Sequence, residues 1–310
     1  METARWKAFL AAVDTGSLSS AAKALNYTPS GVSQLISALE HDLGFALLHR
    51  TNKGVSATSE GERLLAAIRS LLQQEERIYQ LGAEIKGLSV GNITIATYSS
   101  MATCWLPQVI RAFQEDFPNI HIRLVENQRQ TILQQLNDNQ ADLGFLSLQE
   151  DMPYDCIPLA EIPLIALLPK IHPLAEADSF PIARCTQEQF VACAFGHDDD
   201  IESFFKKHDI DPYIRFSTLE NSASLAMIEN GLCIRITNLL VAQSLPSFDV
   251  AVLPLDPPQR LTMGIAMPSL KHASPAVRKF TQYAVRILAP CGPQVKSIEP
   301  VRRPFLNETK

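Results

Sequence analysis

Residues 16–40 of the chain read GSLSSAAKALNYTPSGVSQLISALE. Ser17 is placed to cap a helix over residues 18–25, whose apolar side chains recur at helical spacing. After a short turn, Thr28 is placed to cap a longer helix, with Pro29 at its first position, where a missing N–H leaves no hydrogen bond unmade. Two helices joined by a tight turn are typical of the helix-turn-helix.

The helix that begins at Pro29 has two contrasting faces. Its buried side is predicted from apolar residues at helical spacing, namely Val32, Ile36, Leu39 and Leu43. The opposite side is polar and carries Ser30, Ser33, Gln34 and Ser37. Such a face is either merely solvated or is the surface that enters the major groove of DNA. An earlier amphipathic helix is predicted from Trp6, Phe9, Leu10 and Val13.

Downstream of Gly44, residues 45–58 predict a wing, two short strands around a polar turn. Arg50 and Lys53 place two cations near the tip of this wing, where they would reach phosphates. Arg50 could instead pair with a local acid such as Asp42.

The charge balance does not by itself indicate a nucleic-acid binder. The net charge is −6, and residues 1–58 carry five Lys or Arg against four acids, a formal charge of +1. Strong DNA affinity would therefore need more than one copy of the domain. The sequence has no membrane-length apolar stretch and no signal-peptide pattern, so we expect a cytoplasmic protein. The six cysteines form no CxxC pair, and neither a metal nor a cofactor is expected.

Residues 59–90 predict a long linker helix. Ser59 and Glu62 have capping-box spacing, and no proline follows before Lys86. A heptad-like seam with two defects steps along Leu64, Ile68, Leu71, Glu75, Ile78, Gly82 and Ile85. A helix of about 28 residues would span about 42 Å, which is long for a small domain. We interpret it as a dimerisation helix, and packing along its own chain is the alternative.

From Gly91 onward, short apolar runs alternate with amphipathic helices, which predicts an α/β fold with mainly parallel strands. The chain is expected to cross into a second lobe near residues 163–168 and to return near residues 261–267. Helices in that second lobe are expected near residues 187–190, 201–208 and 222–230, and strands near residues 190–194, 215–217 and 233–237.

The N-terminal motifs resemble the signature of LysR-type transcriptional regulators. The resemblance rests on Gly16–Leu25, Val32–Glu40, Leu43-Gly44, Leu47-Leu48, Arg50-Thr51 and Thr58-x-x-Gly61. It implies a sequence-specific regulator that binds double-stranded DNA as a homodimer or homotetramer. Pro29 departs from the family pattern, in which a polar residue often reaches a base. The DNA-binding residues implied are Thr28, Pro29, Ser30, Ser33, Gln34, Arg50 and Lys53, with Ser30, Ser33 and Gln34 as the main base-contact candidates.

The C-terminal part is similar to the effector domain of the same family, which resembles periplasmic solute-binding proteins. The matching marks are Leu106-Pro107, Phe113, Phe117-Pro118, Ala141-Asp142-Leu143, His172-Pro173-Leu174 and Asn230-Gly231-Leu232. The fold class expected is an N-terminal all-α winged helix-turn-helix plus a long linker helix, then a C-terminal α/β two-lobed periplasmic-binding-protein-like effector domain. The expected bounds are 1–58 for the DNA-binding domain, 59–90 for the linker, 91–290 for the effector domain (lobe I about 91–162 and 267–290, lobe II about 163–266) and 291–310 for a disordered tail.

Ligands of such lobes lie past the carboxyl ends of strands and against helix N-termini. The predicted effector-binding residues are Ser99, Ser100, Met101, Gln128, Ser147, Thr218 and Arg235. Hydroxyl and N–H donors suit a carboxylate, so we expect a small carboxylate effector between the lobes. Ser99 and Ser100 could instead only cap a helix, and Arg235, which replaces a small apolar residue of the family, could be a salt-bridged structural residue. The acidic run at residues 197–200 is interpreted as a helix cap rather than a metal site.

Two other classes of function stay open. An enzyme is disfavoured because no Walker or GxGxxG motif is present. A thiol-based redox regulator is the alternative, because Cys185 and Cys193 lie eight residues apart in the predicted second lobe, loosely similar to peroxide-sensing members of the family. The sequence leaves the effector, the operator and the sign of regulation open.

Overall fold

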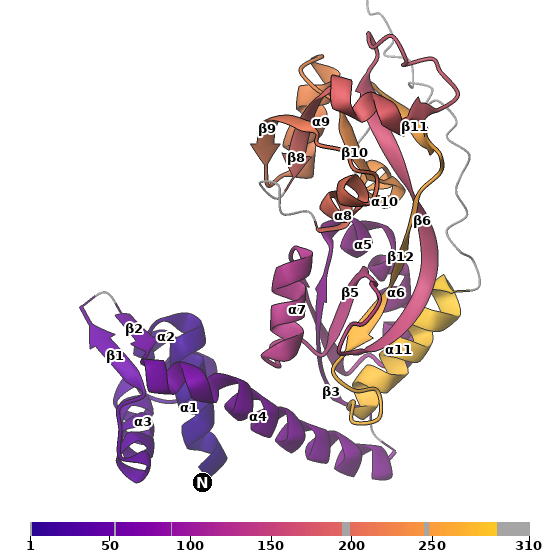
Figure 1. Ribbon diagram of the computed structural model, residues 1–310. Helices are drawn as coiled ribbons and strands as arrows, with labels where there is room; N and C mark the ends of the chain where they lie inside the picture. The colour runs from indigo at the N-terminus through magenta and orange to yellow at the C-terminus, as the bar shows by residue number, and fades with distance from the viewer. Residues whose placement is uncertain (1, 53, 88, 194–198, 245–247, 290–310) are drawn as a thin grey trace, which may run out of the picture.

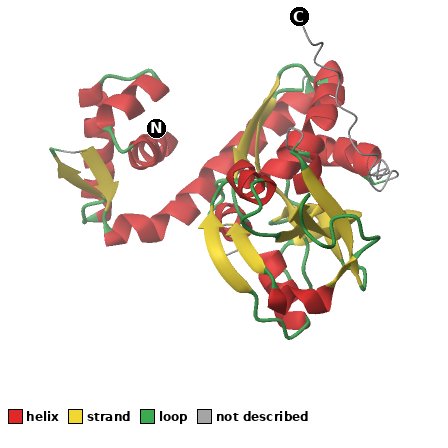
Figure 2. Ribbon diagram, turned by 90° about the horizontal axis from the view of Figure 1, so that it is seen from above, coloured by secondary structure: helices red, strands yellow, loops and turns green. Residues whose placement is uncertain are grey.

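The computed structural model describes residues 2–52, 54–87, 89–193, 199–244 and 248–289. A small N-terminal unit stands apart from a larger α/β unit, and the long helix α4 (Ser59–Ile85) joins them (Figure 1). Seen from above, α4 runs from the N-terminal helices to the side of the α/β unit (Figure 2). Lys53 and the predicted tail at 291–310 lie outside the described residues. In the described part of the chain, no helix is both long and apolar enough to cross a membrane.

The N-terminal unit packs helices around one apolar core and carries a hairpin wing. Its elements are α1 (Glu2–Thr15), α2 (Leu18–Leu25), α3 (Pro29–Leu43), β1 (Leu48–Thr51) and β2 (Gly54–Ala57). Both predicted caps form, since the Ser17 hydroxyl accepts the Ser20 N–H and the Thr28 hydroxyl accepts the Gly31 N–H. Its fully buried large side chains include Phe9, Val32, Ile36 and Leu47. The predicted winged helix-turn-helix is confirmed.

A close backbone contact fixes the wing against the end of α1. The Val55 N–H donates to the Gly16 carbonyl at 2.9 Å. Gly54 has a φ of +136°, and a Cβ at this position would lie 2.5 Å from the same carbonyl oxygen. Because an L side chain would be both strained and in collision, glycine is required here, and the wing is held close to the helices.

The α/β unit holds the remaining elements. Its strands are β3 (Gly91–Thr97), β4 (Ile120–Glu126), β5 (Leu143–Ser147), β6 (Asp155–Pro169), β7 (Phe180–Pro181), β8 (Gln189–Cys193), β9 (Tyr213–Thr218), β10 (Arg235–Asn238), β11 (Val250–Asp256) and β12 (Arg260–Met267). Its helices are α5 (Ser99–Cys104), α6 (Leu106–Asp116), α7 (Arg129–Asn137), the 3₁₀ helix η1 (Ile182–Gln187), α8 (Asp199–Lys207), α9 (Asn221–Glu229), α10 (Leu239–Gln243) and α11 (Pro275–Leu288).

The long strand β6 belongs to both lobes of this unit (Figure 1). Up to Pro163 it pairs antiparallel with β12, which also pairs with β5 in lobe I. Beyond that point it pairs with β10 and β11 in lobe II. Pro163 and Arg260 are partners in the β6–β12 ladder, so the two connections between the lobes run side by side.

Two of the predictions about the α/β unit are wrong. The strands are not mainly parallel: β3 runs parallel to β4 and β5, and β8 parallel to β9, but β6 and β12 run antiparallel to each other. The reason is geometric, because one strand leaves lobe I and the other returns to it. The helix expected at residues 187–190 is also absent, since η1 ends at Gln187 and β8 begins at Gln189. Phe190 and Val191 are buried on opposite faces of that strand.

Candidate functional site

The exposed N-terminal end of α3 presents the residues predicted to contact DNA. Pro29 and Ser30 are exposed on its first turn. Thr28 has a structural task there, because its hydroxyl accepts the Gly31 N–H at 3.1 Å and lies 3.1 Å from the Ser30 hydroxyl. Thr28 and Ser30 can still reach a phosphate or a base edge, but Pro29 offers only apolar surface.

Arg50 of β1 is bonded to the polar face of α3. Its Nη1 donates to Ser33 Oγ at 2.9 Å, and its Nη2 lies 3.4 Å from Ser37 Oγ and 3.5 Å from Glu40 Oε2. Gln34, next to Ser33, is exposed and makes no side-chain hydrogen bond with any described residue. Wing and helix therefore present one continuous surface, with the Arg50 guanidinium beside the predicted base-contact residues.

The acid beside Arg50 is Glu40, not Asp42. Asp42 pairs with Arg5 of α1. Glu40 also fixes the chain after α3, because its Oε1 accepts the Leu47 N–H at 2.8 Å. The weak 3.5 Å contact with Glu40 leaves Arg50 exposed and able to reach a phosphate.

Helix α4 is docked at both ends on its own chain. In its first half, Ile68 is buried in the N-terminal core and Arg69 pairs with Asp14 at 2.6 Å. In its second half, the buried Gln80 accepts the Ala276 N–H of α11 at 3.4 Å. Helix α4 therefore connects the wing-bearing unit directly to lobe I.

An apolar stripe nevertheless stays exposed along α4. Its members are Leu71, Ile78, Tyr79 and Ile85, whose side chains are 44%, 68%, 68% and 88% exposed. Four large apolar side chains on one solvated helix are unusual in a monomer. This stripe, the α4 stripe, includes three residues of the predicted dimer seam.

Between the two lobes lies a cluster of buried polar groups. Ser147 Oγ, at the end of β5, donates to Asp200 Oδ1 of α8 at 2.7 Å and accepts from Arg129 Nη1 at 2.9 Å. Tyr98 Oη, just after β3, lies 3.1 Å from Ser147 Oγ and donates to Asp200 Oδ2 at 3.3 Å. Ser147, Arg129 and Asp200 are all less than a tenth exposed. We call these four residues the interlobe cluster.

In the interlobe cluster, lobe I already holds a carboxylate. Tyr98 follows β3, Ser147 ends β5 and Arg129 begins α7, so all three donors sit at the carboxyl-terminal edge of the lobe I sheet. Asp200, the acceptor, comes from lobe II. Two hydroxyls and a nearby guanidinium are the groups that bind carboxylates elsewhere in proteins.

The other predicted effector residues are spread more widely. Ser99 is exposed and Ser100 buried at the start of α5, and Met101 lies in the lobe I core. Gln128 is the exposed N-cap residue of α7, beside Arg129. Thr218, at the end of β9, accepts the Glu220 N–H at 3.2 Å. Of the predicted set, the structure places only Ser147 in the interlobe cluster.

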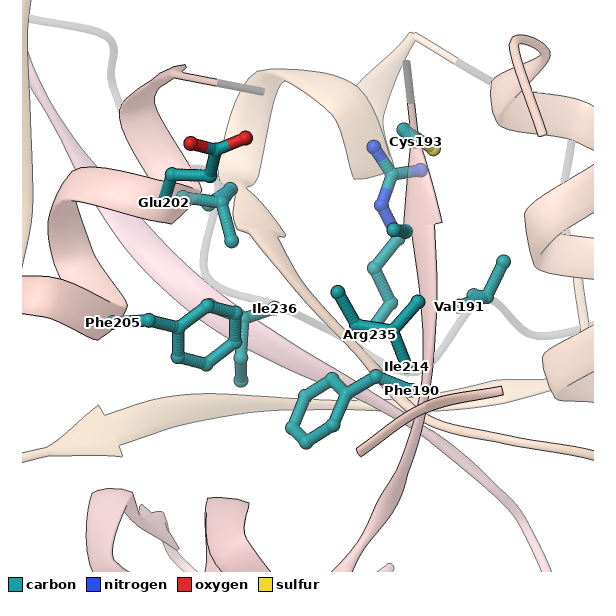
Figure 3. Close-up of a pocket in the computed structure, with 10 residues that line it drawn as sticks. Phe190, Val191, Cys193, Glu202, Phe205, Ile214, Arg235 and Ile236 are labelled. Carbon is teal, nitrogen blue, oxygen red and sulfur yellow. The ribbon is translucent and has the colours of Figure 1, made fainter. Parts of the chain in front are cut away.

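Arg235 lines a separate pocket inside lobe II. The guanidinium points toward Cys193, and the Glu202 carboxylate lies on the other side of the pocket (Figure 3). Arg235 Nη1 donates to Ser224 Oγ of α9 at 2.8 Å. The alternative prediction was that Arg235 is a structural residue held by a salt bridge. Among the described residues, no carboxylate lies within ion-pair distance of Arg235.

The two cysteines of the redox alternative are both buried, and Cys185 is a free thiol. Burial, helped by the charge of Glu188, raises the pKa of the Cys185 thiol to about 12. Cys193 Sγ lies 3.7 Å from Asn221 Oδ1. Among the described residues, no cluster of His, Cys, Asp or Glu could hold a metal ion.

A winged helix-turn-helix, a long helix with an exposed apolar stripe and a two-lobed α/β unit together define a ligand-responsive transcription regulator. Comparison with known families assigns the chain more narrowly. The model of the bacterial regulatory helix-turn-helix protein, lysR family, matches residues 3–62, and that of the LysR substrate binding domain matches residues 86–289. The chain belongs to the LysR family of DNA-binding transcriptional regulators with an effector-binding domain.

Individual relatives and solved structures resemble the chain over most of its length. The uncharacterized HTH-type transcriptional regulator YvbU of Bacillus subtilis (strain 168) is 29% identical over 287 residues, 92% of this chain and 98% of its own. Full-length CbnR, crystallised with its target DNA, is 21% identical with a TM-score of 0.64, covering 92% of this chain and 99% of that one. The effector-binding domain of QuiR in complex with shikimate is 22% identical with a TM-score of 0.57, covering 64% of this chain and 98% of that one.

Sequence reasoning missed three members of the interlobe cluster. Tyr98 and Arg129 each adjoin a predicted residue, Ser99 and Gln128 respectively, so the rule that ligands bind past strand ends could have included them. Asp200 was interpreted only as part of a helix cap. Its contact with Ser147 joins residues 53 positions apart, which no local pattern predicts.

Proposed function

We propose that this chain is a cytoplasmic, sequence-specific regulator that binds DNA as a homodimer or homotetramer and responds to a small carboxylate bound between its lobes. The observation that carries the effector class is the interlobe cluster, in which Ser147 and Tyr98 hold the carboxylate of Asp200. Donors arranged around one carboxylate suit another of the same geometry. QuiR, whose effector domain binds shikimate, a carboxylate, supports the same class.

Asp200 gives this site a simple switching chemistry. The effector carboxylate would take the place of the Asp200 side chain on Ser147 and Tyr98, and α8 would then lose its hold on lobe I. Only an effector that binds one lobe arrangement better than the other can shift their balance, and competition with Asp200 supplies that difference. Since Gln80 and Ala276 join α4 to lobe I, a change in lobe arrangement reaches the DNA-binding unit through α4.

The DNA surface proposed is the end of α3 with the adjoining wing. It comprises Thr28, Pro29, Ser30, Ser33, Gln34, Arg50 and Lys53, the last of which lies outside the described residues. The low positive charge of the DNA-binding domain is consistent with a need for two copies of it on the DNA. The exposed α4 stripe offers a surface through which two chains would pair.

The redox alternative is less well supported. A thiol reacts with an oxidant as its thiolate, and a pKa of about 12 leaves the Cys185 thiol almost entirely protonated at neutral pH. Mass spectrometry of the peroxide-treated protein would detect a Cys185–Cys193 disulfide directly. Its formation, together with a change in DNA binding, would favour the redox function over the carboxylate one.

The carboxylate proposal is tested on the full-length protein by thermal shift. The probes are carboxylates of about the size of shikimate, shikimate among them, and each is paired with its neutral amide. We expect one or more carboxylates to raise the melting temperature of the wild type, and the amides to have no effect. Ser147→Ala should abolish that response, and Thr103→Ala, which removes an exposed hydroxyl of α5, should preserve it. A response that survives Ser147→Ala would place the effector elsewhere.

A further inference from the structure

Lobe II contains a small pocket that is not part of the interlobe cluster. It measures about 50 Å³ and is bounded by α8, β8, β9 and β10 (Figure 3). Most of its lining side chains are apolar, namely Phe190, Val191, Ala192, Ile201, Phe205, Ile214 and Ile236. The polar residues on its wall are Arg235, Glu202 and Cys193. All of them belong to lobe II, so this pocket is separate from the Ser147 donors of lobe I.

The unusual feature of the pocket is the cation on its wall. Arg235 is only 4% exposed. Within the described part of the chain, the one hydrogen bond of the Arg235 side chain goes to the neutral hydroxyl of Ser224, at 2.8 Å. Charged groups are rarely buried without an opposite charge, because removing them from water costs several kcal/mol. A buried guanidinium with spare donors facing a cavity has the chemistry of an anion site.

The rest of the wall limits which anion fits. Phe205 and Ile236 form an apolar floor, which favours a hydrocarbon body over a fully hydrated ion (Figure 3). Glu202, 38% exposed and 3.5 Å from Lys206, places a negative charge on the side opposite Arg235. That charge disfavours a second anionic group on the ligand. The small volume admits only a few carbon atoms.

We propose that this pocket binds a short-chain monocarboxylate, whose carboxylate pairs with Arg235 and whose alkyl body packs under α8. This is a second ligand site, beyond the interlobe effector site of the proposed function. The two sites share helix α8, because Asp200 faces lobe I while Ile201 and Phe205 line the pocket. A ligand under α8 therefore changes the support of the Asp200 carboxylate and couples the two sites.

The test uses the full-length protein with acetate, propionate and butyrate, and butyramide as the neutral control. Binding is followed by saturation-transfer NMR and by thermal shift. We expect butyrate to bind and butyramide not to. Arg235→Met should weaken butyrate binding at least about tenfold, the loss typical of a charge-assisted hydrogen bond to a buried partner. Glu202→Gln should leave butyrate binding intact or tighten it.

The melting temperature measured without a probe distinguishes an arginine that binds a ligand from one that only stabilises the fold. If Arg235 is an uncompensated buried cation, Arg235→Met should raise the melting temperature, because a methionine fills similar space without a charge. A lower melting temperature together with an unchanged butyrate affinity would overturn the proposal. Ala192→Leu, which fills the pocket and keeps Arg235, should also abolish butyrate binding, and it supplies the same test if the methionine variant does not fold.

A last comparison distinguishes this site from the interlobe site. Ser147→Ala removes a donor of the interlobe cluster and leaves the lobe II pocket untouched, so butyrate binding should survive it. Loss of butyrate binding in Ser147→Ala but not in Arg235→Met would contradict this inference and place the carboxylate between the lobes instead.

Discussion

Ser147 and Asp200 are joined by a 2.7 Å hydrogen bond that connects the end of β5 in lobe I to α8 in lobe II. Both side chains are buried. The carboxylate has two hydroxyl donors, Ser147 and Tyr98, and both belong to lobe I. One acidic side chain of the protein thus occupies a set of donors that a ligand of the same chemistry could use.

Replacing Asp200 should therefore change both the lobes and the ligand affinity. Asp200→Asn removes the charged acceptor, so the contact between α8 and lobe I weakens. The side chain at position 200 then also competes less well with a carboxylate effector for the Ser147 and Tyr98 hydroxyls. We expect faster amide exchange in α8 and a carboxylate affinity raised within the range of about 5- to 150-fold typical of coupled sites. Asp209→Asn makes the same change at an exposed aspartate just beyond the end of α8, outside both carboxylate sites, and it serves as the control. Equal exchange and equal affinity in both variants would mean that Asp200 does not compete.

At the DNA surface, Gln34 and Arg50 should behave differently. Gln34→Ala should weaken binding to the operator, selected in vitro from random DNA, by about 1–3 kcal/mol, and leave non-specific binding nearly unchanged. Arg50→Ala should weaken binding to all sequences and flatten the salt dependence, because it removes a cation close to the phosphates. Arg111→Ala, an exposed arginine on α6, is the control. If Gln34→Ala lowers the affinity for every DNA sequence equally, Gln34 does not take part in base readout.

What could be predicted from sequence depends on the range of each interaction. The caps at Ser17 and Thr28 involve residues three positions apart, so local rules predicted both helices. Ser147 was placed correctly at a strand end by the rule for α/β lobes, although its effector role stays a prediction.

Interactions between distant residues could not be predicted in this way. Asp200 comes from the other lobe, and its role depends on how the lobes close. Arg235 was singled out as an unusual residue, but sequence could not decide whether an acid would face it. For the same reason Asp42 was named as a local acid with which Arg50 could pair, whereas the fold of the wing brings Arg50 to Glu40.

The exposed α4 stripe predicts how the chain assembles. Ile78→Asp places a charge at the middle of this stripe, where it would oppose a second copy of the helix. We expect the oligomer to dissociate, or to become dependent on protein concentration, while the fold is kept. Sedimentation velocity measures the assembly and circular dichroism the fold. Ile171→Asp, at an isoleucine of lobe II that is 86% exposed, is the control. An identical sedimentation profile for wild type and Ile78→Asp would exclude the stripe as an interface.

The burial of Asp142 in lobe I should give the protein a pH-dependent stability. Burial raises the pKa of the Asp142 carboxyl to about 6, the Thr94 N–H opposes this shift, and the charge of Glu76 on α4 adds to it. Because the folded state holds this proton more tightly than the unfolded chain, stability falls as the pH rises from about 4 through 6.

Chemical denaturation at a series of pH values measures this effect against Asp142→Asn, which keeps an oxygen acceptor for the Thr94 N–H at 2.8 Å but cannot ionise. Relative to that variant, the free energy of unfolding of the wild type should fall by at most about 3 kcal/mol between pH 4 and pH 7, since one unit of pKa corresponds to about 1.4 kcal/mol. Glu76→Gln should reduce the loss, because it removes the charge that α4 contributes. A stability difference between wild type and Asp142→Asn that is constant over this range would mean that Asp142 titrates at the same pH in the folded and unfolded chain.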